Sequence, residues 1–165
     1  AYYRSPYVFV QRAGEDYTVR TFDDDLRALV QDLFDTMYLA EGRGLAAPQV
    51  GVSLRVFVMD ASWKRGDRQP LAVINPVIHA TEPPMIVDDE GCLSIVGISV
   101  PVERPAWVVM EWTTPEGETT RQRFEGFASA CVQHELGHLN GTVTLDHLSG
   151  PARNRAEIAY SGTKQ

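Results

Sequence analysis

The length, composition and charge of the chain narrow its class before any motif is considered. With 165 residues, 44% of them hydrophobic and 22% charged, it suits one globular domain, residues 1–165, with a substantial core. A formal net charge of -7 argues against direct binding of nucleic acid or of an anionic membrane. No apolar run approaches the roughly 20 residues that span a bilayer, and residues 1–11 lack a signal-peptide pattern. We therefore expect a cytoplasmic protein whose two cysteines are reduced thiols.

The first half of the chain predicts one helix followed by short strands. Residues 23–40 carry apolar side chains at helical spacing behind an acidic start, which suits a helix N-terminus. A glycine-containing loop is expected over residues 41–51. Apolar runs rich in β-branched residues predict strands at 54–59 and 71–75, with an extension over 77–80.

The second half predicts a hairpin and then a helix. Two strands are predicted, at residues 106–113 and 119–124. A β-turn is expected between them at 114–117, because proline and glycine favour turns. Helical spacing returns over residues 127–139, and the tail 151–165 predicts a short helix with a frayed end. Together, the predicted helices and strands indicate an α+β domain.

The strongest chemical signal lies on that later helix. His134, Glu135 and His138 form an HExxH pattern, in which the two imidazoles are one helical turn apart and can bind one metal ion. Glu135 can then reach a water molecule at the metal without being a ligand, as metal-assisted hydrolysis requires. The alternative interpretation is a pair of solvent-facing histidines.

A catalytic metal site needs a third protein ligand. Downstream candidates are Asp146, His147 and Glu157, and a ligand there would suit a zincin-type metallopeptidase. Upstream, Cys92 lies in the segment Glu-Gly-Cys-Leu-Ser, and a thiolate with two imidazoles suits zinc or ferrous iron. Glu90, beside this cysteine, is expected to support a ligand by a hydrogen bond.

A glycine-rich segment is the third motif, after HExxH and the segment that contains Cys92. Residues 42–49, Gly-Arg-Gly-Leu-Ala-Ala-Pro-Gln, permit close approach of another chain and end on Gln49, whose amide can stabilise negative charge on a carbonyl oxygen. Alone, such a segment is usually only a connection.

Taken together, GRGLAAPQ, EGCLS and QHELGHLNG resemble the three signature motifs of the peptide deformylase family, in the same order. The resemblance runs from about residue 23 to residue 149. It implies antiparallel or mixed β-sheets around a central metal-binding helix, and a metal-dependent hydrolase that removes the formyl group from N-formylmethionyl nascent peptides and releases formate.

The resemblance also implies a role for each matched residue. Cys92, His134 and His138 would hold one divalent metal, with Fe2+ expected as the native ion and Zn2+, Ni2+ or Co2+ as alternatives. Glu135 would act as general base and then general acid. Gln49 and the backbone N–H of Leu93 would stabilise the oxyanion.

Substrate binding would use the remaining motif positions. Gly44 and Gly91 would pair with the peptide backbone as an added strand. Ala130, Cys131 and His134 would line a pocket for methionine, and Arg43 would lie near the rim of the groove, where the family often has an aliphatic residue.

Some positions depart from the family pattern. Gly137 stands where the family usually has an aspartate that pairs with an arginine, here Arg104, and we expect Arg104 to turn to Glu103 or to solvent instead. Val96 replaces a common proline. These differences predict a divergent member with altered stability or substrate preference.

Three functions are compatible with these motifs. Deformylation is preferred to a zincin-type metallopeptidase and to a non-catalytic relative that binds formylated peptides, because the proposed catalytic set is intact. The expected partners are formylated nascent peptides and the ribosome near the exit tunnel. We expect a monomer in the cytoplasm of a bacterial or virus-infected bacterial cell, with an organellar setting as an alternative.

Overall fold

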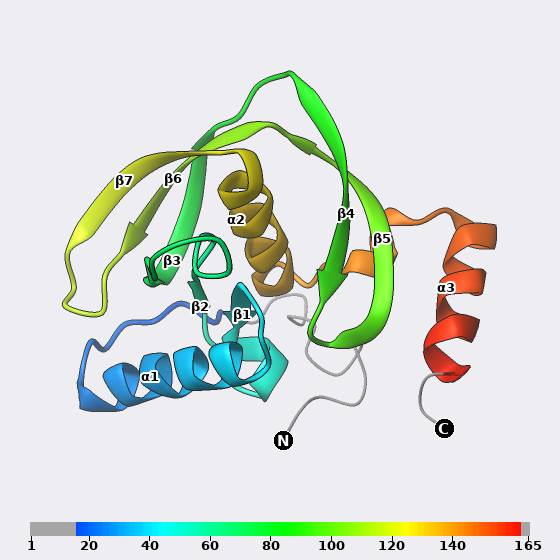
Figure 1. The fold of residues 1–165 in the computed structure, drawn as a ribbon. Coiled ribbons are helices and arrows are strands. Elements are labelled where there is room, and N and C mark those ends of the chain that lie inside the picture. Colours follow the sequence, from blue (N-terminus) through cyan, green and yellow to red (C-terminus); the bar gives the residue numbers. More distant parts are fainter. Residues whose placement is uncertain (1–15, 163–165) are drawn as a thin grey trace.

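The computed structural model describes residues 16–162, which form three helices and seven strands around one site (Figure 1). The helices are α1 (Asp24–Leu39), α2 (Gly126–Leu139) and α3 (Gly150–Gly162), with short 3-10 helices at Ala47–Val50 and Thr144–His147. The strands are β1 (Gly44–Ala46), β2 (Val56–Met59), β3 (Leu71–Ala80), β4 (Met85–Cys92), β5 (Ile95–Pro105), β6 (Trp107–Thr113) and β7 (Thr119–Glu125).

Two antiparallel sheets face each other across α2. The larger has the order β1-β2-β3-β6-β7, and the smaller is the β4–β5 hairpin. Figure 1 shows α2 between them, with α3 beyond the hairpin. The predicted α+β class with antiparallel sheets around the HExxH helix is confirmed.

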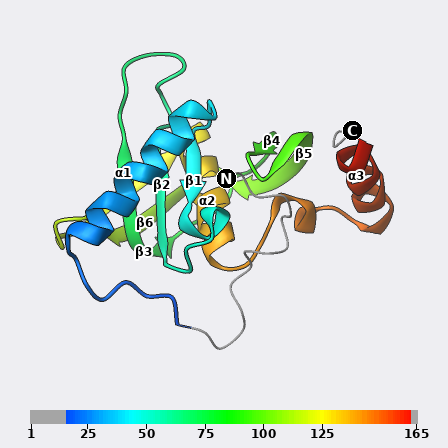
Figure 2. The same cartoon turned by 90° about the horizontal axis from the view of Figure 1, so that it is seen from below.

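The larger sheet is buried on both faces at β2. Alternate strand residues point to opposite faces, so Val56 and Val58 pack with α1 while Phe57 and Met59 pack with α2. Figure 2 shows α1 and α2 on either side of the sheet. This two-sided burial explains why β2 reads as a continuous apolar run.

The helix α1 begins where its sequence predicts. The Asp23 carboxylate accepts a hydrogen bond from the backbone N–H of Leu26 at 3.0 Å, satisfying one of the free donors of the first turn. Leu26, Val30, Leu33 and Met37 form its buried stripe. The predicted range 23–40 therefore agrees with the structure to within one residue at each end.

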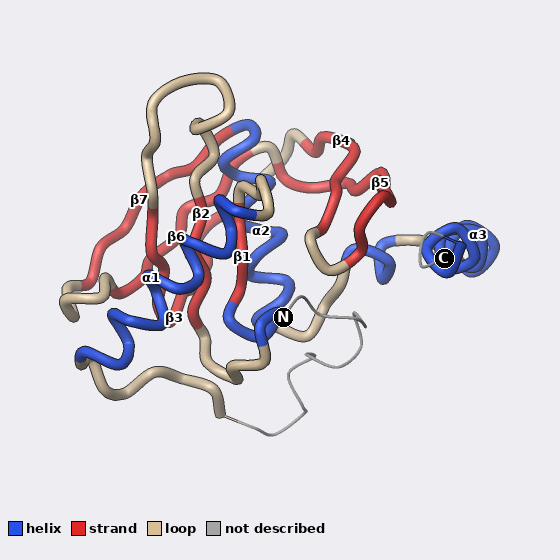
Figure 3. The backbone as a smooth tube through the Cα atoms, turned by 60° about the horizontal axis from the view of Figure 1, so that its bottom comes forward, coloured by secondary structure: helices blue, strands red, loops and turns tan. Residues whose placement is uncertain are grey.

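The hairpin of β6 and β7 is also confirmed, with Trp107 opposite Glu125 and Thr113 opposite Thr119. The extension at 77–80 belongs to β3, which continues through an irregularity at Asn75, whose φ is +52°. Two predictions were incomplete: the expected loop 41–51 contains β1, and the β4–β5 hairpin was not predicted. Figure 3 shows both strands of that hairpin standing apart from the larger sheet.

Candidate metal centre and active site

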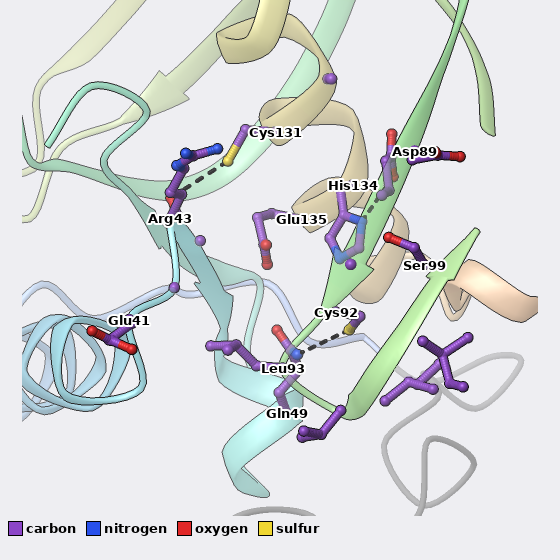
Figure 4. A pocket seen from close by; sticks show the side chains of 18 of the residues that line it. Glu41, Arg43, Gln49, Asp89, Cys92, Leu93, Ser99, Cys131, His134 and Glu135 are labelled. Carbon is purple, nitrogen blue, oxygen red and sulfur yellow. Dashed lines mark hydrogen bonds and ion pairs between the residues drawn. The ribbon is translucent and has the colours of Figure 1, made fainter. Parts of the chain in front are cut away.

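Three potential ligands meet where α2 faces the end of β4. The Nε2 atoms of His134 and His138 are 3.3 Å apart, and the Cys92 Sγ lies 3.4 Å from the His138 Nε2. Figure 4 labels two of the three, Cys92 and His134. Imidazole and thiolate ligands at about 2.0–2.3 Å from a tetrahedral metal lie roughly 3.3–3.6 Å from one another. The donor atoms therefore fit a single metal ion, and their chemistry suits a zinc-like or ferrous ion.

The local fold explains why these side chains converge. His134 and His138 are one turn apart on α2. Cys92 is the last residue of β4, where the register with β5 shifts and the chain turns through Leu93 and Ser94. The turn thus aims the thiol at the helix face that carries both histidines.

Glu90 fixes the orientation of His134. Its Oε2 lies 3.0 Å from the His134 Nδ1, which leaves Nε2 toward Cys92 and His138. The Arg104 guanidinium donates two hydrogen bonds to Glu90, at 2.5 and 2.8 Å. The expectation that Arg104 would pair with Glu103 or face solvent is wrong, because the hairpin brings it to Glu90.

Glu135 lies within the same cavity but outside the ligand cluster. Its side chain is 4% exposed, and its Oε2 has no hydrogen-bond partner among the described residues. A buried carboxylate oxygen without a partner is costly, and Figure 4 shows the Glu135 side chain in the pocket between Arg43 and His134. Glu135 therefore lies beside the ligand cluster with one carboxylate oxygen unpaired among the described residues.

Gly44 makes room for that carboxylate. A Cβ at position 44 would collide with the Glu135 Oε1 and would lie 2.8 Å from its Cδ. The lack of a side chain is therefore a steric requirement of the site, whatever the backbone of β1 binds.

Gln49 is held in one orientation by hydrogen bonds at both ends. Its Oε1 accepts from the backbone N–H of Ala46 at 2.9 Å, while its Nε2 donates to the Ser94 Oγ at 2.9 Å and to the Cys92 Sγ at 3.7 Å. The amide N–H2 is consequently directed at the ligand cluster. Ser94 was not singled out from the sequence, although it lies within the EGCLS motif.

An open cleft of about 570 Å³ joins these groups. Among the predicted site residues, those that line it are Gln49, Leu93, Arg43, Gly44, Gly91, Ala130, Cys131, Cys92, His134 and Glu135. His138 does not line the cleft and is buried, with 6% exposure. Phe127, Lys64 and Val96 also line it, and sequence reasoning gave the first two no role.

The comparisons with known proteins point to one family. The family model for polypeptide deformylase matches residues 9–154. A peptide deformylase of Caulobacter vibrioides is 43% identical over 138 residues, covering 84% of this chain and 80% of the relative.

Solved structures extend the likeness to the fold. A peptide deformylase from Legionella pneumophila superimposes with a TM-score of 0.90 at 34% identity, covering 99% of this chain and 94% of the other. One from Synechococcus elongatus, in complex with actinonin, gives 0.87 at 35% identity, covering 98% and 86%. The chain belongs to the peptide deformylase family.

The family assignment decides between the three functions weighed from the sequence. Deformylation is supported over a metallopeptidase and over a non-catalytic relative. Two of the three downstream candidates, Asp146 and Glu157, form ion pairs with Arg153 instead. The metal group that the described residues form is Cys92, His134 and His138.

Electrostatics at this deformylase site favour an ionised thiol. Burial disfavours the Cys92 thiolate, but hydrogen bonds with His134 and His138 outweigh burial and hold the pKa of the thiol well below its usual range. Burial likewise opposes the charged form of His134, yet its contacts with Cys92 and Glu90 raise its pKa to about 10. A divalent metal ion held by these residues would take the place of those protons.

The two other buried acids of the cleft behave differently. Burial raises the pKa of Glu135, which favours proton uptake by its carboxylate. Burial also raises the pKa of Cys131 well above its usual range, so that this thiol stays neutral. Cys131 is therefore suited to line an apolar pocket in the deformylase rather than to act as a nucleophile.

Proposed function

We propose that the chain hydrolyses the formyl group of N-formylmethionyl nascent peptides, with the cleft residues in the roles below. The observation that carries this proposal is the meeting of one thiol, two imidazoles, a partnerless carboxylate oxygen of Glu135 and a directed amide of Gln49 in one cleft. Formate and a free N-terminal amine are the products.

Cys92, His134 and His138 would hold one divalent metal, for which we propose Fe2+ as the native ion. Zn2+, Ni2+ and Co2+ suit the same donor set. When bound, the ion supplies a Lewis acid that lowers the pKa of water and polarises the formyl oxygen.

The residues of the chain move the proton and hold the charge. The Glu135 carboxylate accepts a proton from the water that attacks the formyl carbon, and it returns that proton to the amine nitrogen as the C–N bond breaks. The Gln49 Nε2 and the backbone N–H of Leu93 donate hydrogen bonds to the oxygen on which negative charge develops. Burial of Glu135 supports the first step, since it raises the pKa of the carboxyl and so favours proton uptake.

The peptide would bind as an added strand. β1 is the edge of the larger sheet, paired only with β2 in the described sheet order, so one side of its backbone is available beside the cleft. Gly44 and Gly91 lie on the two walls and would pair with the peptide backbone. Ala130 and Cys131, on the α2 wall, would contact the methionine side chain.

We further propose a monomer that acts on chains near the ribosomal exit tunnel in the bacterial cytoplasm. The metal ligands and the cleft come from one chain, which supports activity without a second copy. No helix within residues 16–162 is long and apolar enough to cross a membrane.

The test measures formate released from formyl-Met-Ala-Ser by anaerobically prepared, nickel- or iron-loaded protein, with mass spectrometry of the remaining peptide. We expect formate and intact Met-Ala-Ser in equal amounts, and no reaction with acetyl-Met-Ala-Ser. Cleavage of an internal peptide bond would favour the metallopeptidase. Absence of formate from folded, metal-loaded protein would overturn the proposal.

A further inference from the structure

An arginine without an anionic partner stands at one end of the cleft. The Arg43 guanidinium carbon lies 4.5 Å from the centre of the Phe127 ring, a cation–π contact. Its Nε is buried without a hydrogen-bond partner, and no carboxylate among residues 16–162 forms an ion pair with it. Figure 4 shows the side chain beside Cys131, whose Sγ donates to the Arg43 carbonyl at 3.5 Å.

This end of the cleft is remote from the metal ligands. Phe127, Cys131 and His134 are spaced at i, i+4 and i+7 on α2, so they follow one helix face, and all three line the cleft. At 1.5 Å per residue, Phe127 lies about 10 Å from His134 and about 6 Å from Cys131 along the helix axis. Arg43 therefore stands one helical turn beyond the proposed methionine pocket.

A peptide bound as an added strand would place its third side chain at this point. The step rests on the proposed function, in which the methionine side chain contacts Ala130 and Cys131. Side chains of an extended strand alternate, and those of residues one and three lie on the same face about 6.6–6.8 Å apart. That spacing matches the distance from Cys131 to Phe127.

We propose that Arg43 is a specificity-determining residue that favours an acidic side chain at the third position of the formylated peptide. The stack on Phe127 holds the guanidinium in place, so that less conformational freedom is lost when it pairs with a carboxylate. Glu41 and Asp89 also line the cleft, and the chain carries a net charge of -7. Lys64 is the other lysine or arginine that lines the cleft, so the assignment to Arg43 rests on its stack with Phe127 at the place expected for the third side chain.

The first arm compares kcat/KM for amidated peptides formyl-Met-Ala-Xaa-Ala with Asp, Asn or Lys as Xaa. We expect Asp to exceed Asn by about two- to fivefold at low salt and Lys to be the poorest, with the differences shrinking as salt rises. Aspartate at the second position should bring no gain. Equal rates for the three peptides, or a preference confined to position two, would overturn the inference while leaving deformylation intact.

The second arm changes the arginine. In Arg43→Met and Arg43→Gln, the ratio of kcat/KM for the Asp peptide to kcat/KM for the Lys peptide should fall close to one, even if both values change. Arg68→Met is the matched control, because Arg68 also stacks on an aromatic ring, Tyr38 at 4.0 Å, but does not line the cleft. An unchanged ratio in both folded Arg43 variants would contradict the assignment. If neither variant folds, the peptide series decides, and absence of formate from every peptide would overturn the proposed function and this inference with it.

Discussion

At the scale of the residue, Glu90 connects Arg104 to the ligand His134. It receives two hydrogen bonds from Arg104 and contacts the Nδ1 of His134, while the ligand Cys92 follows two positions later. These contacts hold the pKa of the Glu90 carboxyl at about 2, because the hydrogen bonds from Arg104 and His134 exceed the opposing effect of burial. The carboxylate is therefore charged in its role of orienting the histidine.

Replacing Glu90 by glutamine should weaken metal binding without removing a ligand. We expect the affinity for nickel or zinc to fall about 10–100-fold in Glu90→Gln, since loss of a carboxylate partner to a ligand histidine has this effect. Competition with a chelator measures it. Asp89→Asn is the control, because Asp89 is exposed and adjacent. Similar affinities in the two variants would show that the contact with His134 has no such role.

A second residue-scale prediction concerns Gln49 and the stabilisation of negative charge on the formyl oxygen. In Gln49→Leu we expect kcat to fall about 10²–10³-fold, because the directed N–H2 donor is lost, while the metal content stays at one ion per chain. The measurement is steady-state formate release beside metal analysis. A kcat within threefold of the parent would exclude Gln49 as an oxyanion donor.

At the scale of the element, α2 carries a glycine where a side chain could stand. A Cβ at position 137 would meet Thr142 atoms no closer than 3.6 Å, an ordinary contact. Glycine inside a helix costs about 1 kcal/mol relative to alanine. We therefore expect Gly137→Ala to raise Tm by about 2–4 °C for a domain of this size, with metal binding retained.

Gly44→Ala is the counterpart in β1, where the added Cβ would lie against Glu135. It should reduce formate release sharply, because either β1 or the carboxylate must move. Calorimetry measures the Tm of Gly137→Ala, and an activity assay measures formate release by Gly44→Ala. A destabilised Gly137→Ala, or a fully active Gly44→Ala, would contradict this description of the two sites.

The elements differ in how far the sequence could predict them. α1, α2 and the β6–β7 hairpin follow from local periodicity, capping and turn residues. The strand β4 could not be found in this way, because Met85, Ile86 and Val87 are consecutive apolar residues that are all exposed. β1 has only three residues and forms through pairing with β2.

In the site too, local sequence features could be predicted, whereas contacts made by the tertiary fold could not. The meeting of Cys92, His134 and His138, and the position of Glu135 beside them, could be predicted because each lies in one helix or one short motif. The pairing of Arg104 with Glu90 could not, since it joins residues 14 positions apart and depends on the hairpin. The stack of Arg43 on Phe127 likewise joins segments that only the tertiary fold brings together.

At the scale of the whole molecule, the metal site ties the two sheets together through α2. Cys92 belongs to the β4–β5 hairpin, whereas α2 also packs on the larger sheet. A ligand that binds only the folded chain stabilises it by about 4 kcal/mol at 1,000 times its Kd. We expect metal loading to raise Tm by about 8–16 °C over chelator-treated protein.

The increase should disappear in Cys92→Ala, which keeps the fold but lacks one ligand. Differential scanning calorimetry of loaded and chelated samples measures both. Equal melting temperatures for loaded and chelated parent, with the metal shown to be bound, would separate the site from the stability of the fold.

The most direct test of the central claim, that this chain is a metal-dependent deformylase in which Glu135 carries the proton, is single-turnover formate release by the parent and by Glu135→Gln. Both proteins should hold one metal ion per chain and give the same fold by circular dichroism. We predict a rate at least about 10²-fold lower in the variant, since loss of a general acid–base typically costs about 10²–10⁴-fold. Formate release by Glu135→Gln within tenfold of the parent would contradict the account.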